Sequence, residues 1–185
     1  MHARLDAQQY LDTVLEALDG EAECRSLLDQ MPVPVYTTDA DGNVTYWNRA
    51  CVDFAGREPK LGQDRWCVTW KIYTTNGDFL PHDQCPMAQA IRQKREIRGK
   101  VAIALRPDGR RRAFTPYPTP LFAEDGSLKG AVNMLVDVTD EQAGALAEQA
   151  SRCRRLAQAT TDRDVADMLL SMARGYDETA DALRG

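Results

Sequence analysis

The fold of this chain is decided by the stretch Val35-Tyr-Thr-Thr-Asp-Ala-Asp-Gly-Asn-Val-Thr-Tyr-Trp-Asn48. Two runs of β-branched and aromatic residues flank a centre at Asp41-Gly42, where glycine offers the positive φ that a tight reversal needs. This pattern predicts a hairpin of two short strands. Asn48 is a good N-cap and favours the start of a short helix directly after the hairpin.

A second informative stretch follows about a hundred residues later, Gly130-Ala-Val-Asn-Met-Leu-Val-Asp-Val-Thr-Asp140. It predicts a long strand that leads into a helix. Between the two stretches, helical patterns come first and two further strands follow, at about 97–105 and 111–122. This order predicts an α+β fold in which one antiparallel sheet of five main strands carries its helices on one face. A small additional hairpin is expected at 70–80.

Three prolines at alternate positions, Pro116, Pro118 and Pro120, mark the strand over 111–122. Their missing N–H groups all fall on one side of that strand, so this side cannot form a hydrogen-bonded ladder there. We therefore expect pairing with the preceding strand to stop near Thr115. The unpaired segment should line a pocket or a packing surface.

The chain divides into three parts: a helical segment over 1–30, a core domain over 31–140 and a helical hairpin over 141–185. The first helix has an apolar stripe at helical spacing, and so do the last two. Such stripes need a partner, which is another helix of this chain or a second copy. The stripe that we expect in a dimer or partner interface consists of Leu11, Val14, Leu15 and Leu18.

Composition excludes several classes of protein. The chain has 185 residues and a net charge of −5, which argues against a nucleic-acid binder. No apolar run approaches the roughly 20 residues that cross a bilayer, and the N-terminus lacks the apolar core of a signal peptide, so we expect no membrane contact and a cytoplasmic location. The five cysteines are an odd number without regular spacing, which favours buried thiols over disulfides. A basic stretch over 92–112 is either a solvated rim or a docking surface for an acidic partner.

Residues 31 to about 140 resemble the PAS domain, a widespread signalling module. The resemblance lies in Tyr36–Ala50, in Leu61-Gly62-Gln63, in Phe114–Leu121 and in Gly130–Asp140. The segment Asp78-Phe-Leu-Pro-His-Asp-Gln-Cys-Pro-Met87 is similar to the approach to the long helix in one large bacterial subgroup, marked by His-Asp-x-Cys-Pro.

The resemblance implies a non-enzymatic bacterial sensor or adaptor, in which the sheet passes a signal to the helix after the last strand. Asp137, Thr139 and Asp140 match the family's junction between strand and signalling helix. Only 45 residues follow Asp140, too few for a catalytic domain, so we expect a single-PAS protein that acts through other proteins. A homodimer and a partner such as a histidine kinase are expected.

The alternative is a sensor that binds a small ligand between the sheet and the helices. Candidate pocket residues are Tyr36, Trp47, Trp70, Tyr73, Phe114, Tyr117, Asn133 and Leu135. Asn133 is the one polar residue among apolar neighbours on the last strand. If it points inward, its amide needs a hydrogen-bond partner, which is either a ligand or the protein itself.

No cofactor is required by this sequence. His82 is the one candidate haem ligand in the core, although its surroundings are also typical of a helix start. Flavin photochemistry is not expected, because Asn48-Arg-Ala-Cys51 only superficially resembles the reactive cysteine motif and lies on the wrong helix. Cys67, His82 and Cys85 lack paired metal-ligand spacing. We find no nucleophile elbow and no phosphate-binding glycine loop, so no enzyme activity is expected.

Overall fold

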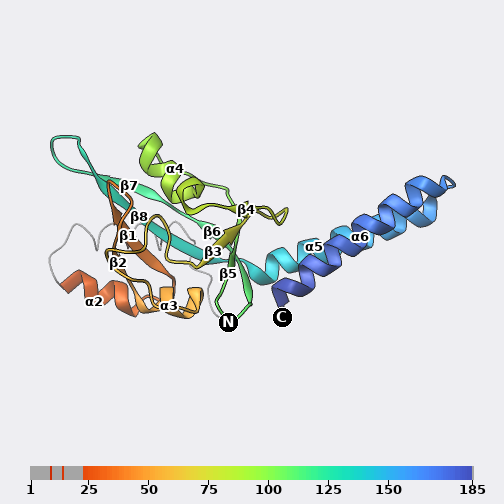
Figure 1. Cartoon of the computed structure of the whole chain (residues 1–185), viewed down its shortest axis with the longest axis horizontal. Coiled ribbons are helices and arrows are strands. Elements are labelled where there is room, and N and C mark those ends of the chain that lie inside the picture. The colour runs from red at the N-terminus through yellow and green to blue at the C-terminus, as the bar shows by residue number, and fades with distance from the viewer. Residues whose placement is uncertain (1–8, 10–13, 15–22, 185) are drawn as a thin grey trace.

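The computed structural model describes Gln9, Val14 and residues 23–184 (Figure 1). Its centre is one antiparallel sheet in the order β2-β1-β8-β6-β5-β3-β4, and β7 pairs with β8 beside this path. The strands are β1 (Val35–Asp39), β2 (Val44–Trp47), β3 (Lys71–Tyr73), β4 (Phe79–Leu80), β5 (Ala102–Leu105), β6 (Arg111–Pro116), β7 (Thr119–Phe122) and β8 (Leu128–Asp137). The two stretches quoted above are therefore neighbours, because β1 pairs with β8 from Val35↔Met134 to Asp39↔Gly130.

The sheet has eight strands, three more than the five main strands expected, because the small hairpin expected at 70–80 joins the sheet and one expected strand is divided in two. The small hairpin β3–β4 adds to the edge of β5 through the pairs Lys71↔Leu105 and Tyr73↔Ile103. The expected strand over 111–122 is broken at residues 117–118 into β6 and β7, which both pair with β8. Proline has no N–H group to continue the ladder, and this explains the break at Pro118.

The preceding strand was expected to stop pairing with the proline-containing strand near Thr115, and this is confirmed. The same end of pairing makes the preceding strand shorter than expected. The last pair between β5 and β6 is Ala102↔Phe114, so the strand expected at 97–105 begins only at Ala102. Arg98 lies beside the unpaired segment instead. Its guanidinium donates to the Pro118 carbonyl and to Thr119 Oγ1, both at 2.9 Å.

The helices are α2 (Glu23–Gln30), α3 (Arg49–Ala55), α4 (Pro86–Gln93), α5 (Thr139–Ala159) and α6 (Arg163–Arg184), with a 3₁₀ turn η1 (His82–Gln84) before α4. Asn48 is the N-cap of α3, as expected: its side-chain oxygen accepts from Cys51 N at 3.3 Å and from Val35 N at 3.0 Å. Asp83 does not cap α4, because it lies within η1 and the N-cap is Cys85.

Both faces of the sheet are covered, so the expectation of helices on one face was wrong. The main core lies between the sheet and helices α3 and α4, around Tyr36 and Phe114. On the opposite face, Leu28 of α2 packs against Val35, Val132 and Met134, and Val14 belongs to the same cluster. The central strands β1 and β8 have apolar side chains on both of their faces, and each face must be buried.

The helical hairpin of α5 and α6 projects away from the sheet (Figure 1). The start of α5 and the end of α6 attach the hairpin to the sheet, because Ala143 and Leu183 pack against Ile103 and Ala113. The expected N-terminal stripe of Leu11, Leu15 and Leu18 lies outside the described residues, and of it only Val14 is described, fully buried. Over the described part of the chain, no helix combines the length and apolarity needed to cross a membrane.

Candidate functional site: the junction between sheet and hairpin

The expected ligand pocket is only partly assembled. Tyr36, Phe114 and Leu135 are buried together in the main core, and Trp47 packs against this core from the side. Asn133 joins them through a hydrogen bond to the Tyr36 hydroxyl.

Three predicted pocket residues lie elsewhere. Trp70 is 44% exposed, with the Lys71 ammonium 4.5 Å from its ring centre. Tyr73 packs on the far side of the sheet with Ile103, and Tyr117 packs on the far side with Val132. The alternation of side chains along a strand explains both errors, because Tyr73 follows the inward Ile72 and Tyr117 follows the inward-facing Pro116.

Asn133 has its partners within the protein. Its Nδ2 donates to the Tyr36 hydroxyl at 3.0 Å, and its Oδ1 accepts from the Tyr117 backbone N at 2.9 Å. The Tyr36 hydroxyl in turn donates to the Trp66 carbonyl at 3.0 Å. Complete burial raises the pKa of Tyr36 well above its usual value, so this hydroxyl stays protonated. The result is a hydrogen-bonded chain through the core that includes Trp66, a residue to which no sequence pattern pointed.

His82 is half-buried, and its Nε2 atom is buried without a hydrogen-bond partner. Burial lowers its pKa, so the imidazole is neutral near pH 7. The charges of Asp64, Arg57 and Asp83 act on the ring. The haem role considered for His82 stays a prediction.

The buried thiols have the environment of structural cysteines. Cys51 donates its S–H to the Val35 carbonyl at 3.3 Å, and burial raises its pKa. Burial also raises the pKa of Cys85 to about 12. Thiols with such pKa values are poor nucleophiles and poor metal ligands. Among the residues that the structure describes, no group of three or more His, Cys, Asp or Glu side chains could hold a metal ion.

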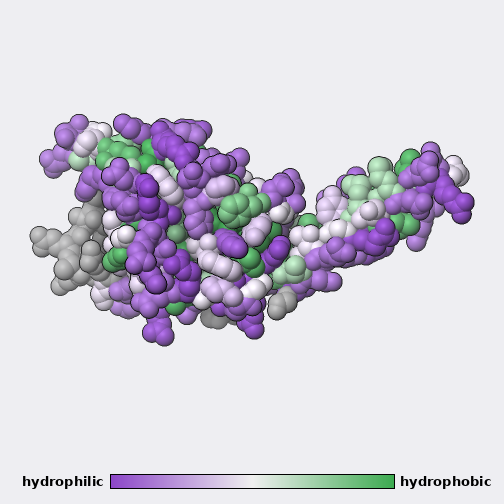
Figure 2. All heavy atoms as spheres, viewed as in Figure 1, coloured by the Kyte–Doolittle hydropathy of each residue, from purple (hydrophilic) through white to green (hydrophobic). Residues whose placement is uncertain are grey.

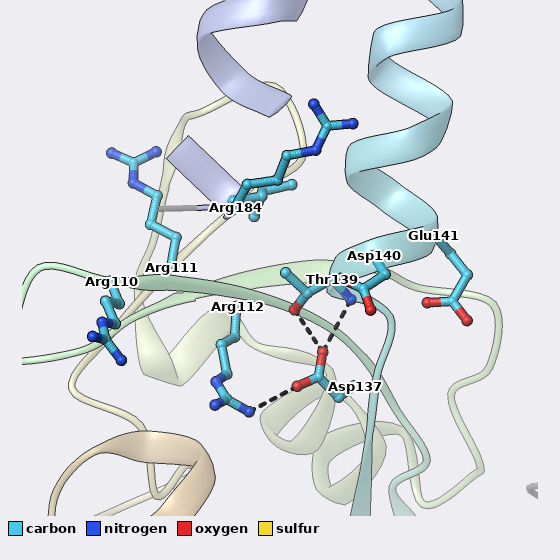
Figure 3. Close-up of a pocket in the computed structure, with 9 residues that line it drawn as sticks. Arg110, Arg111, Arg112, Asp137, Thr139, Asp140, Glu141 and Arg184 are labelled. Atoms are coloured by element: carbon cyan, nitrogen blue, oxygen red, sulfur yellow. Dashed lines mark hydrogen bonds and ion pairs between the residues drawn. The ribbon is translucent and has the colours of Figure 1, made fainter. Parts of the chain in front are cut away.

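Two of the three predicted junction residues, Asp137 and Thr139, meet in one small network where β8 ends and α5 begins (Figure 3). Asp137 Oδ1 accepts from the Thr139 backbone N at 3.0 Å and from the Thr139 hydroxyl at 2.5 Å. Its other oxygen forms an ion pair with Arg112 Nη1 at 3.0 Å. Thr139 Oγ1 also accepts from the Ala113 backbone N at 3.1 Å. Asp140 lies in the first turn of α5.

This network joins three elements that are far apart in the sequence. Asp137 ends β8, Thr139 begins α5, and Arg112 with Ala113 belongs to β6. The Arg112 guanidinium also lies 5.9 Å from the centre of the Phe54 ring in α3. Phe54 contacts Phe114 edge to face, with ring centres 5.5 Å apart. A continuous set of contacts therefore runs from the main core to the start of α5.

The electrostatics of the junction favour a carboxylate at this place. A helix N-terminus carries a partial positive charge and unpaired N–H groups, both of which stabilise nearby acids. Asp137 supplies an acceptor to the first N–H group, and Asp140 with Glu141 adds negative charge in the first turn. The ion pair with Arg112 is about two-fifths exposed, so its own contribution is small and depends on salt.

Two surface hollows border this ion pair. One has a volume of about 680 Å³ and lies among Arg110, Arg111, Glu141 and Arg184 (Figure 3). The other, of about 400 Å³, lies beside α2 and α3. Arg112 and Asp137 line both hollows. The sequence analysis selected Asp137 and Thr139 but not Arg112, which was noted only as part of the basic stretch over 92–112. The strand register Phe114↔Asp137 brings Arg112 close to Asp137.

Residues 28–143 match the sequence profile of the family described as PAS fold, which is more than half of the chain. This chain belongs to the PAS family. The match includes the whole sheet, helices α3 and α4, and the first turn of α5. The PAS fold expected from the sequence is therefore confirmed.

Solved structures of similar fold include Light-Oxygen-Voltage (LOV) proteins. The LOV protein of Rhodobacter sphaeroides is 16% identical with a TM-score of 0.46, over 97% of this chain and 96% of that one. An RNA-binding Light-Oxygen-Voltage receptor is 17% identical with a TM-score of 0.47, and the match covers 76% of this chain but only 37% of that receptor. A LOV domain from a flavin-analogue study is 13% identical with a TM-score of 0.50, over 71% of this chain and 96% of that one. At such identities the likeness concerns the fold alone. Among curated proteins, none matches the chain.

Proposed function

We propose that this PAS protein is a non-enzymatic bacterial sensor or adaptor, which relays a signal to other proteins through its flanking helices. The observation that carries the proposal is the network of Arg112, Asp137 and Thr139. It ties the strand in the centre of the sheet to the first turn of α5. A change in the core can therefore reach the helical hairpin through a few defined hydrogen bonds.

The relay has three steps. A perturbation of the main core shifts Phe114 or Asn133, whose strands meet at the junction: β6 begins there and β8 ends there. The shift alters the ion pair between Arg112 and Asp137, which is exposed enough to open at low cost. Thr139 then loses the acceptor that holds the first turn of α5, and the hairpin changes its position or order.

The output is a contact with another protein. We propose a homodimer and a protein partner such as a histidine kinase, with Leu11, Val14, Leu15 and Leu18 as one candidate contact stripe. We also assign the chain to the PAS subgroup with the His-Asp-x-Cys-Pro helix start, and we expect it to act in the cytoplasm. These assignments rest on the sequence.

A ligand held between the sheet and helices α3 and α4 is the second candidate function. It is supported by the aromatic side chains of the main core. It is disfavoured because Asn133, the polar group that a ligand would address, already bonds to Tyr36 and Tyr117. A bound ligand has to replace those two bonds.

Hydrogen–deuterium exchange on a double-mutant cycle tests the relay. Tyr36→Phe removes the hydroxyl that bonds to Asn133 in the core, and we expect faster exchange in the first turn of α5. In an Asp137→Asn background the same change should have no further effect there, because the connection is already weakened.

A matched control removes a hydroxyl elsewhere in the sheet. Thr45 Oγ1 lies 2.8 Å from Thr37 Oγ1, far from the junction in the chain. Thr45→Val should leave exchange at α5 unchanged. Equal effects of Tyr36→Phe in the wild-type and Asp137→Asn backgrounds would contradict the relay.

A further inference from the structure

The two faces of the helical hairpin differ in chemistry. On one face Arg154 of α5 bonds to Asp177 of α6, and the helical period places Leu170, Arg174 and Asp181 beside Asp177. The opposite face of α6 presents Val165, Met168, Met172, Gly175 and Thr179, which recur at spacings of three and four. Leu156 of α5 lies on this same face, because it is half a helical turn away from Arg154.

This second face, which we call the apolar face, is exposed. Met168 is 55% exposed, Leu156 49% and Met172 44%. The hairpin's own interface is filled by small side chains instead, namely Ala150, Cys153 and Ala173. Green, hydrophobic atoms are visible on the outer half of the hairpin in Figure 2, and others are visible over the sheet domain. Large side chains that lie outside a two-helix hairpin are typical of an interface with further helices.

The apolar face is open to a second copy toward the tip of the hairpin. Nearer the sheet, Gly175 and Thr179 border a hollow of about 380 Å³ together with Thr75 and Asn76 of the same chain. The part of the face that a second copy can cover therefore runs from Met172 to the tip.

Charges at the outer half of the hairpin indicate that the occupant is a second copy. Arg152 and Arg155 are exposed along the outer edge of α5, whereas Asp164 and Asp167 are exposed along the outer edge of α6. Suppose that the two-fold axis runs along the length of the helices. Each α5 then lies opposite the partner's α6, and the turns between α5 and α6 of the two copies lie at the same end of the bundle. The basic edge of one copy then meets the acidic edge of the other at both sides of the contact. A two-fold axis across the hairpin would instead place α5 against α5 and bring basic edges together.

We infer that two copies of this chain pack the apolar faces of their hairpins together as a four-helix bundle, in which neighbouring helices are antiparallel. This inference deepens the proposed function and rests on it, since it names a second copy as the partner of the hairpin that the junction controls. The contact is isologous: Met168 and Met172 of each copy lie near its centre.

Sedimentation velocity of the full chain between 1 and 100 µM tests the inference. We expect a concentration-dependent dimer for the wild type. The double variant Met168→Glu/Met172→Glu should weaken the dimer by at least about 30-fold, because it places charges at the centre of the contact. Leu170→Glu is the matched control: Leu170 is 38% exposed on the opposite face, and its variant should dimerise as the wild type does.

Charge reversal tests the arrangement of the two copies. Arg152→Glu/Arg155→Glu should weaken the dimer several-fold, and adding Asp164→Arg/Asp167→Arg to the same chain should restore it. A monomeric wild type at 100 µM, or equal effects at Met168/Met172 and at Leu170, would overturn the inference. Circular dichroism shows whether each variant keeps its helices.

The two proposals can fail separately. Coupling between Tyr36 and α5 is measured within one chain, so a monomeric Met168→Glu/Met172→Glu variant that keeps this coupling leaves the relay standing. A stable wild-type dimer without the coupling leaves the bundle standing.

Discussion

The sheet core and the helical hairpin are packed with different kinds of side chain. The core buries large ones, with Tyr36, Phe114 and Ile72 at most 2% exposed. The hairpin buries alanines and a cysteine between its helices and leaves Leu156 and Met168 outside. Apolar burial stabilises in proportion to area, so the core is stable by itself while the hairpin depends on what covers it. The sheet is therefore held by its own packing, and the hairpin is the part that the proposed relay repositions.

Phe114→Ala should give the largest effect and would sharpen this contrast. The ring is buried against Phe54, and its loss leaves a cavity that costs about 3–5 kcal/mol of unfolding free energy. Met168→Ala, on the exposed apolar face, should cost far less in the monomer. Urea denaturation at low protein concentration measures both. Similar losses at the two sites would break the contrast.

Asn133→Ala should destabilise the core by about 1–3 kcal/mol, because it leaves the Tyr36 hydroxyl and the Tyr117 N–H with fewer partners. Urea denaturation gives the free energy. Tyr36→Phe combined with Asn133→Ala should cost less than the sum of the single changes, since both remove the same bond. Strict additivity would mean that the two side chains do not act as a pair.

Asp137→Ala removes the acceptor at the start of α5, and we expect a loss of about 1 kcal/mol. Glu178→Ala is the matched control, because this exposed acid of α6 lines neither of the two hollows at the junction. Thermal unfolding should show a lower midpoint for the first variant only. A midpoint unchanged by Asp137→Ala would show that the hairpin is held by the contacts of Leu183 and Ala143 alone.

The smallest expected effect is the pH dependence from His82. Burial lowers the pKa of His82 below the ordinary 6.5. Between the folded and the unfolded pKa, the imidazole is therefore protonated in the unfolded chain and neutral in the folded chain. Stability from this group is present above pH 6.5 and decreases as the pH falls toward the folded pKa. Urea denaturation between pH 7.5 and 5 should show a steeper loss for the wild type than for His82→Asn. Parallel curves would contradict the burial of a neutral imidazole.

Much of the core could be predicted from local patterns. Asp41-Gly42 and Asn48 are short-range signals whose chemistry requires one backbone conformation, and both were interpreted correctly. The direction of Asn133 was left open by the sequence, and the structure shows the side chain 2% exposed. The hairpin at 70–80 was expected, but its joining to β5 is a pairing between distant segments, to which no local signal points. The division of 111–122 into β6 and β7 was also missed.

The candidate site was predictable in part for the same reason. Asp137 and Thr139 belong to one short motif, so the sequence was sufficient to predict that they lie together at the junction. Arg112 enters the site only through the register of β6 on β8, and its contact with Phe54 needs the packing of α3. Tyr73 and Tyr117 were placed in the wrong layer because a shift of one residue along a strand moves a side chain to the other face.

The sequence by itself determined the turns, the caps and the family to which this chain belongs, because these depend on residues that are neighbours along the chain. Only the tertiary structure decided which arginine pairs with Asp137, which face of the sheet each aromatic side chain occupies and which face of the hairpin is left apolar. Those outcomes depend on contacts between segments up to a hundred residues apart, and such contacts are selected by the packing of the whole domain.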